Sequence, residues 1–514
     1  MNIGHKVVRG IIYNATGTIF VQLVGFIPAI IIARTLGPEL QGTYVLILSI
    51  PATLNIFITL GWNQGLNRYI PALRGENREG LIAPILRRVF TLRIVLSVLA
   101  VLFLFLFSDL IGNLFNIEEW LDWQILTLIS AYLIITNFNS ILSLVLTVNY
   151  QQKWLNLVNA LSVSVMLLGI LGLIYFEAMN MKNILFVALM PQLISLICLP
   201  IVYKRGISLP HNYNPGELTE YIKEFVKYSS IVYLIQLAGF ILAYRSDIYF
   251  IAFYLGTASV SFYSIANGFF ERSTGILGNR ATGSMILGAM TEKYKQAGKS
   301  ALIVGFSYHI QLIMLYNVPI IFGGIFLARD IIPVIYGADF MPVVPLLLAI
   351  FLVRFFTRFG GAYSGVLIAL GKPQYLLWTK IISIVNIPLN ILLIPRIGVM
   401  GAVIATAISV LTTTSVEIFL TLRIISLKFP FKNAFKLLLC GTIMLLGVFL
   451  FRELVVIDNA GLKLALAIFL GALIYVFMIL NLNALNEEIW SFMPEKPVRI
   501  LNKMRVSKRG LRAD

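Results

Sequence analysis

The sequence predicts an all-α integral membrane protein of about fourteen transmembrane helices, with two six-helix bundles in parallel repeat and two extra C-terminal helices. Three observations support this fold class. Of 514 residues, 59% are hydrophobic and only 12% are charged, whereas soluble domains carry roughly 25% charged residues. Apolar runs of membrane-spanning length recur along the whole chain. In addition, one stretch near the start recurs after six such runs.

The apolar runs define the elements in order. A spanning helix needs about 20 mostly apolar residues. The first run has no small-residue cleavage site, so we expect it to span the membrane and not to act as a signal peptide. The predicted spans cover residues 11–33, 43–63, 86–108, 125–147, 155–175, 182–203, 228–254, 258–288, 301–327, 342–369, 375–395, 400–422, 435–453 and 462–484.

The net charge of +17 is explained by the loops. Basic residues crowd the cytoplasmic loops of membrane proteins. Here Lys and Arg concentrate on the side of the two termini, whereas loop 116–123 on the other side has three acids and no base. We therefore expect a multi-pass protein of the cell membrane with both termini in the cytoplasm. Membrane lipids are expected partners, and nucleic acid is not.

The repeat predicts the domain organisation. Residues 32–44 read IARTLGPELQGTY and residues 251–263 read IAFYLGTASVSFY, a displacement of 251 − 32 = 219 positions. Six spans separate the copies, so both copies face the same way, as in transporters built from parallel repeats. The predicted parts are an N-terminal bundle (1–203), a cytoplasmic linker (204–227), a C-terminal bundle (228–425), two added spans (426–484) and a basic cytoplasmic tail (485–514).

Two stretches resemble a known family. IIARTLGPELQGTYVLILSI (31–50), followed by GWNQGLNRYIPALRGENREG (61–80), resembles the start of the O-antigen-type polysaccharide flippases of the multidrug/oligosaccharidyl-lipid/polysaccharide exporter superfamily. So does segment 369–406, with its Gly-Lys-Pro turn, Asn386 and Asn390. The resemblance covers nearly the whole chain. It implies a V-shaped pair of bundles that opens alternately to each side. It also implies a substrate of sugars on a polyprenyl (pyro)phosphate carrier.

Charged residues inside the predicted spans are the first candidates for substrate binding, because each costs at least about 2.5–3.5 kcal/mol at mid-bilayer. All those selected lie in the second predicted bundle. Six are basic and three acidic, and the planar guanidinium of arginine suits phosphate oxygens. We therefore predict that Arg245, Arg272, Arg354 and Arg358 bind the pyrophosphate. The full set is Arg245, Asp247, Glu271, Arg272, Arg280, Arg354, Arg358, Lys380 and Glu417.

Two alternatives for these charges stay open. Asp247, Glu271 and Glu417 can pair with the arginines and cancel their surplus, and basic residues near the inner edge can extend to the headgroups. No phosphate-binding loop is found, because Lys293 stands where the motif ending at AGKS (297–300) requires glycine. A transporter without ATP hydrolysis follows, and Asp247 and Glu417 are its candidate coupling groups for H⁺ or Na⁺.

The first bundle contributes neutral polar groups and one base. Asn63 and Gln64 are expected to point inward, where they can bind sugar hydroxyls or join helices. Arg68 is expected at the inner mouth of the second span, where it attracts the anionic headgroup. The two cysteines lie in apolar runs and support neither a disulfide nor a metal site. No cofactor is expected.

The sequence therefore favours a non-enzyme, a flippase for polyprenyl-(pyro)phosphate-linked oligosaccharide in surface polysaccharide synthesis. Its expected protein partners are a polysaccharide polymerase and glycosyltransferases. A peptidoglycan lipid-precursor flippase and a drug/cation antiporter remain alternatives within the superfamily. A membrane-embedded glycosyltransferase is the alternative of another class.

Overall fold

The computed structural model describes residues 3–76, 78–149, 151–206, 215–241, 244–276, 290, 294, 298–372 and 374–486. In these segments all regular structure is helical, and no strand occurs among them. The all-α prediction is therefore confirmed for the described part of the chain. The side chains of Arg245 and Arg280, the linker residues 207–214 and the tail from residue 487 lie outside it.

The chain divides into two compact units, 1–278 with 380–410 and 279–379 with 411–514. Helices α15 and α17 run from one unit into the other. The helices of the first unit are α1 (Ile3–Thr59), α2 (Trp62–Gly75), α3 (Ile82–Leu106), α4 (Ser108–Phe115), α5 (Trp123–Val148), α6 (Gln152–Tyr175), α7 (Met181–Gly206), α8 (Pro215–Ile241), α9 (Tyr244–Leu255), α10 (Thr257–Ile276) and α16 (Asn386–Ile397). Those of the second are α12 (Lys299–Ile335), α13 (Val343–Thr357), α14 (Gly360–Ala369), α18 (Phe431–Leu454) and α19 (Ala460–Asn481), with α15 (Gln374–Ile382) and α17 (Val399–Ile424) shared.

Eleven helical segments of the described residues are long and apolar enough to cross a membrane. One of them, Ile19–Thr59, has 41 residues, about twice what one crossing of the hydrocarbon needs. Gly37, with φ 73° and ψ 176°, is not helical and divides α1 into two helices that meet at a kink. The predicted spans 11–33 and 43–63 lie on the two sides of Gly37. The count of fourteen spans stays a prediction.

Two local backbone features recur at about the spacing of the sequence repeat. Gly37 and its counterpart Gly256 both adopt a positive φ, 73° and 79°, which favours glycine because it lacks a Cβ. Gly37 bends α1, and Gly256 separates α9 from α10. The short 3₁₀ turn Glu118–Trp120 before α5 likewise matches the turn Ala338–Phe340 before α13, 220 residues later. The recurring residues thus encode recurring backbone bends.

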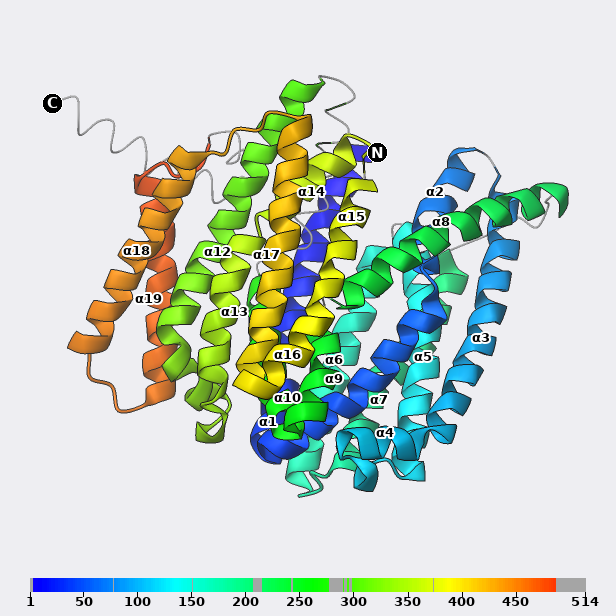
Figure 1. The fold of residues 1–514 in the computed structure, drawn as a ribbon, viewed down its shortest axis with the longest axis horizontal. Helices are drawn as coiled ribbons and strands as arrows, with labels where there is room; N and C mark the ends of the chain where they lie inside the picture. Colours follow the sequence, from blue (N-terminus) through cyan, green and yellow to red (C-terminus); the bar gives the residue numbers. More distant parts are fainter. Residues whose placement is uncertain are drawn as a thin grey trace. The chain divides into compact units, whose positions relative to one another are not determined.

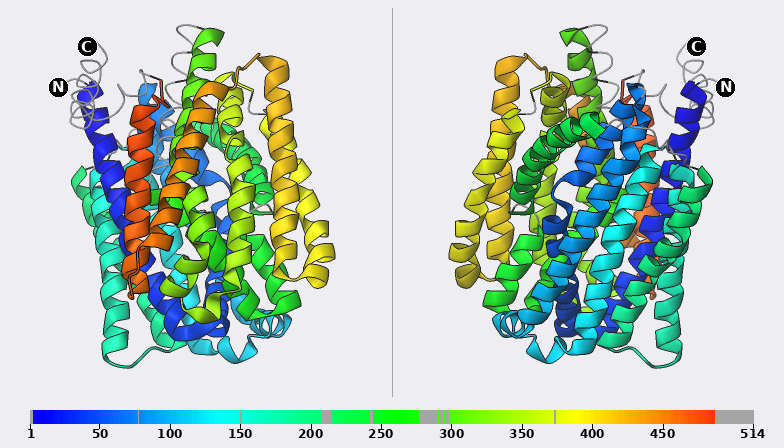
Figure 2. Two further views of the ribbon diagram at one scale, coloured as in Figure 1. Left: turned by 90° about the vertical axis from the view of Figure 1, so that its left-hand side faces the viewer. Right: turned by 90° about the vertical axis from the view of Figure 1, so that its right-hand side faces the viewer.

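Each unit has its own apolar core. In the first unit, α8 crosses α2 (Figure 1), and the core between them includes Leu66, Tyr69 and Phe225. Helices α6 and α7 run side by side (Figure 2). In the second unit, α18 and α19 lie side by side and pack on α12, where Met314, Cys440 and Tyr475 are buried. Many large apolar side chains on the outer faces are exposed, as expected for helices that contact lipid.

Candidate functional site

Helix α2 presents a polar face. It starts after Gly61, whose φ is 72°, and its apolar side chains are buried at Trp62, Leu66 and Leu73. The opposite face exposes Gln64, Asn67 and Arg68, with Asn63 half-buried beside them. Asn63 and Asn67 are four residues apart, as are Gln64 and Arg68, so each pair lies on adjacent turns of one face. We call these four residues the α2 polar face.

A buried arginine lies against this face. Arg93 of α3 is only 2% exposed and lies within the candidate span Glu79–Leu106, five residues after Arg88. Its Nη2 donates to Oδ1 of Asn63 at 2.8 Å, and its Nη1 donates to Oγ of Ser140 in α5 at 3.1 Å. The first turn of α2 therefore lies beside a candidate membrane span. Interrupted helices and polar faces are tolerated within a membrane when they line a water-filled path.

Arg93 was not among the residues predicted from the sequence, because all charged candidates were placed in the second bundle. The available signal was a guanidinium inside the apolar run 89–106, five residues after Arg88. No carboxylate lies within 4.0 Å of Arg93 in the part of the chain that the structure describes, and its Nε is buried without a partner. Arg93 thus carries a buried positive charge whose two hydrogen-bond acceptors are neutral.

The predicted coupling residue Asp247 is the centre of a second polar cluster in the first unit. Asp247 of α9 is fully buried. Its Oδ1 accepts from Nδ2 of Asn390 at 2.7 Å, and its Oδ2 accepts from the hydroxyls of Thr406 at 2.7 Å and Tyr263 at 2.5 Å. Asn390 also donates to Oδ1 of Asn386 at 2.9 Å. Four helices, α9, α10, α16 and α17, meet at this carboxylate.

The Asp247 cluster is rich in oxygen atoms. Oδ1 of Asn390 is buried without a hydrogen-bond partner, and a half-turn of this amide would exchange its nitrogen for that oxygen. Oxygens of Asp247, Asn386, Asn390 and Thr406 would then converge. Asn386 and Asn390 entered the sequence prediction only as part of the family resemblance. Their spacing of four residues, which puts both amides on one helix face, was the usable signal.

The second predicted coupling residue, Glu417, lies in the second unit. It is 7% exposed. Its Oε2 accepts from Oγ of Ser364 at 2.8 Å, and its Oε1 accepts from Oγ1 of Thr379 at 3.2 Å. Gly360 of α14 packs close by, since a Cβ added there would lie 3.4 Å from Oε2. Each oxygen of this carboxylate therefore accepts a hydrogen bond from a neutral hydroxyl group.

The remaining predicted site residues have separate environments. Arg272 of α10 donates to the carbonyl oxygen of Gly25 at 3.3 Å, and its guanidinium carbon lies 5.4 Å from the ring centre of Phe26. Arg354 and Arg358 are both half-buried at the end of α13. Arg68 stacks on Tyr228, with 4.4 Å between its guanidinium carbon and the ring centre.

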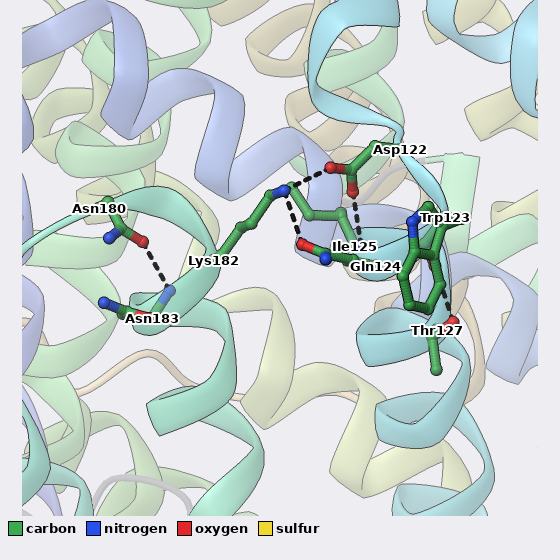
Figure 3. Close-up of polar contacts among 8 residues, drawn as sticks. All are labelled: Asp122, Trp123, Gln124, Ile125, Thr127, Asn180, Lys182 and Asn183. Carbon is green, nitrogen blue, oxygen red and sulfur yellow. Dashed lines mark hydrogen bonds and ion pairs between the residues drawn. The ribbon is translucent and has the colours of Figure 1, made fainter.

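An exposed ion pair joins the first turns of α5 and α7 (Figure 3). Nζ of Lys182 lies 2.6 Å from Oδ2 of Asp122 and donates to Oε1 of Gln124 at 2.7 Å. The Lys182 hydrogen bond, together with that from the backbone N–H of Ile125, holds the pKa of Asp122 below its ordinary value. This acid belongs to loop 116–123, which was expected to face outward. Within the described residues, no group of three or more His, Cys, Asp or Glu suits a metal ion.

Comparison with known proteins gives a family and a fold. A family model described as polysaccharide biosynthesis protein matches residues 7–284. An uncharacterized membrane protein of Methanocaldococcus jannaschii, MJ1068, is 23% identical over 95% of this chain and 97% of its own length. The probable low-salt glycan biosynthesis flippase Agl15 of Haloferax volcanii is 27% identical over 34% of this chain and 37% of its own length.

Two solved structures share the fold. The lipid II flippase MurJ, in an inward closed conformation, is similar with a TM-score of 0.69 and 20% identity, over 91% of this chain and 98% of that chain. A multidrug resistance MATE family transporter of the MOP superfamily, in an inward-facing conformation, is similar with a TM-score of 0.61 and 15% identity, over 81% of this chain and 98% of that chain. At these identities the likeness establishes the fold alone.

Proposed function

Because the chain belongs to the polysaccharide biosynthesis protein family, we propose that it is a flippase that moves a polyprenyl-(pyro)phosphate-linked oligosaccharide across the cell membrane. The resemblance of its N-terminal segments to polysaccharide flippases supports this proposal. The fold that it shares with a lipid II flippase and the partial match to a probable glycan biosynthesis flippase also support it.

The α2 polar face is the observation that carries the proposal. A lipid-linked sugar offers hydroxyl groups that exchange hydrogen bonds and phosphate oxygens that accept them. Gln64 and Asn67 supply amides for the hydroxyls, and Arg68 supplies a cation with planar donors for phosphate. Arg93 adds a positive charge directly behind this face. Interrupted helices form substrate sites in other transporters.

The arginines selected from the sequence complete the proposed path. We assign Arg245, Arg272, Arg354 and Arg358 to binding of the pyrophosphate during translocation. The substrate would pass by alternating access of the two predicted bundles, with both termini in the cytoplasm. A surplus of bases over acids favours an anionic substrate and weighs against an antiporter of cations, which needs acids to hold them.

The Asp247 cluster is the proposed coupling site. Asp247 is fully buried, and its oxygens accept hydrogen bonds from side chains of three other helices. Sodium ions bind oxygen ligands at such sites in transporters, and Asn386, Asn390 and Thr406 place oxygens next to Asp247. Exchange of a proton or Na⁺ at Asp247 would therefore couple the ion gradient to the helices that meet there. Glu417 is the second candidate.

A reconstitution experiment tests the proposed function. The purified full-length chain is inserted into liposomes that contain a polyprenyl-pyrophosphoryl oligosaccharide with a fluorescent sugar, and an impermeant quencher is added outside. Translocation exposes the protected inner pool to the quencher while the lipid stays chemically intact. If this pool stays protected with the protein present, the assignment as an oligosaccharide flippase is wrong. Transfer of the sugar to a new carrier would instead indicate a glycosyltransferase.

A further inference from the structure

We propose that Arg93 is a positioning residue that fixes the side-chain amide of Asn63 as a hydrogen-bond donor, so that the first turn of α2 binds an anionic phosphate oxygen of the substrate. This inference rests on the proposed flippase function and deepens it. It assigns a role to a residue of the first bundle that was absent from the predicted site. It also specifies that the side chain of Asn63 donates a hydrogen bond to the substrate.

The burial of Arg93 is costly. A guanidinium stays protonated at any physiological pH, and a buried charge is normally paired with an acid. Arg93 is 2% exposed, and within the segments described its hydrogen bonds go to the neutral oxygens of Asn63 and Ser140. A chain that needed only a tie between α2, α3 and α5 would achieve it with neutral groups at lower cost. The uncompensated charge is therefore expected to serve an anionic ligand.

Arg93 fixes the orientation of the Asn63 amide. An amide has one oxygen, which accepts, and one nitrogen, which donates two hydrogens. Arg93 occupies the oxygen with a hydrogen bond of 2.8 Å, so the amide cannot turn over without breaking this bond. The nitrogen of Asn63 makes no hydrogen bond within the described residues. Because Asn63 is half-buried at the edge of the α2 polar face, this donor is available to a ligand on that face.

Asn63 also lies at the end of α2 that favours anions. It is the second residue of a 14-residue helix, where the positive end of the helix dipole attracts negative charge. Arg68 lies one further turn along the polar face. The buried charge of Arg93, the fixed donor of Asn63 and the dipole of α2 thus act in the same direction. A phosphate oxygen fits this set of donors better than a sugar hydroxyl, which must also donate.

Asn63→Asp separates this role from a purely structural one. The new carboxylate still accepts from Arg93 and gains an ion pair, so the folded state should be at least as stable as before. The donor, however, becomes a negatively charged acceptor. We expect affinity for a fluorescent polyprenyl-pyrophosphoryl disaccharide to fall by about ten- to a hundred-fold, the factor for losing one hydrogen bond to a charged group. A purely structural Arg93 predicts unchanged affinity.

The first unit offers a matched control. Nη2 of Arg74 donates to Oδ1 of Asn149 at 2.5 Å, so Asn149→Asp makes the same chemical change at an arginine–asparagine pair outside the α2 polar face. Asn149 is half-buried, and its Nδ2 donates to the carbonyl oxygen of Val145 at 2.6 Å, so this variant loses an internal hydrogen bond but no donor to a ligand. We expect it to bind the probe within about two-fold of the unchanged chain. Equal losses in both variants would overturn the proposal.

Substitutions of Arg93 test the proposed positioning of Asn63 independently. Arg93→Met should release the Asn63 amide and raise KM for the probe, while Arg93→Lys, which keeps a charged donor, should restore most of the affinity. Thermal unfolding of each purified variant shows whether it is folded. Unchanged KM in folded Arg93→Met, or unchanged affinity in folded Asn63→Asp, contradicts the inference. Failure of the unchanged chain to translocate the probe contradicts the proposed function itself, so the two failures are distinct.

Discussion

Replacing Asp247 tests the polar cluster that we assign to ion coupling. Two substitutions remove the negative charge in different ways. Asp247→Asn keeps the shape of the side chain and one acceptor oxygen. Asp247→Ala removes both acceptors from a fully buried position. Comparing the two separates the role of the charge from that of the hydrogen bonds.

The structure gives the expected magnitudes. In Asp247→Ala the hydroxyls of Tyr263 and Thr406 and the amide of Asn390 lose their shared acceptor. Each unsatisfied buried donor costs about 1–3 kcal/mol, so the free energy of unfolding should fall by about 3 kcal/mol or more. In Asp247→Asn both hydroxyls can rotate to accept from the new amide. The free energy of unfolding should then change by only about 1 kcal/mol.

Two assays check these expectations. Thermal unfolding of the detergent-purified variants should show a clearly lower unfolding temperature for Asp247→Ala and a nearly unchanged one for Asp247→Asn. In proteoliposomes, imposed Na⁺ or pH gradients should accelerate translocation by the unchanged chain but no longer by Asp247→Asn. Full stability of the alanine variant would contradict the described hydrogen bonds. Retained gradient dependence in the asparagine variant would contradict the coupling role.

Three further predictions follow from other parts of the structure. Gly42→Ala should lower the free energy of unfolding by about 1–3 kcal/mol or more, because the added Cβ would lie 1.8 Å from the carbonyl oxygen of Thr257. Gly172→Ala is the control, because a Cβ there would have nothing within 4 Å. Thermal unfolding should show that this control is as stable as the unchanged chain or more stable. Lys182→Gln should cost under about 1 kcal/mol at pH 7, because the ion pair is exposed. The pKa of Asp122 is lowered in the folded state, so the stabilisation by this ion pair is fully present above the ordinary aspartate pKa of about 3.9. It is lost as the pH falls through the lowered pKa. If Lys182→Gln still differed in stability from the unchanged chain below that pH, the stabilising role of the Asp122–Lys182 pair would be refuted. The double substitution Arg354→Ala with Arg358→Ala should slow translocation of lipid-linked sugar, and a normal rate in the folded variant would remove both arginines from the proposed path.

Hydropathy was sufficient to predict the helical membrane fold, because it depends on local composition; the two parallel bundles that the repeat predicts stay a prediction. The break at Gly61 was not predicted. The span expected at 43–63 ends near it, but the start of α2 just beyond it depends on how closely α8 packs there: a Cβ at Gly61 would lie 2.4 Å from the carbonyl oxygen of Ser229. Such a contact between residues distant in sequence has no local signature.

The candidate site was predictable only in part. Asn63, Gln64 and Arg68 were selected from polarity alone, and the structure places all three on the α2 polar face or at its edge. Asp247 was selected as a lone acid, but its partners Asn390 and Thr406 lie 143 and 159 residues away in sequence. Arg93 was hidden because the surrounding run remains strongly apolar. Tertiary contacts, which one sequence does not reveal, supply these relationships.

The central claim is that the α2 polar face meets water inside the protein and binds the lipid-linked sugar. Cysteine accessibility tests it most directly, in a chain whose Cys198 and Cys440 are replaced by Ala. Gln64→Cys should react with a membrane-impermeant thiol reagent, and a polyprenyl-pyrophosphoryl disaccharide should protect it; Leu446→Cys, on an exposed apolar face of α18, should stay unreactive. An unreactive cysteine at 64, or one that the substrate does not protect, would contradict the account.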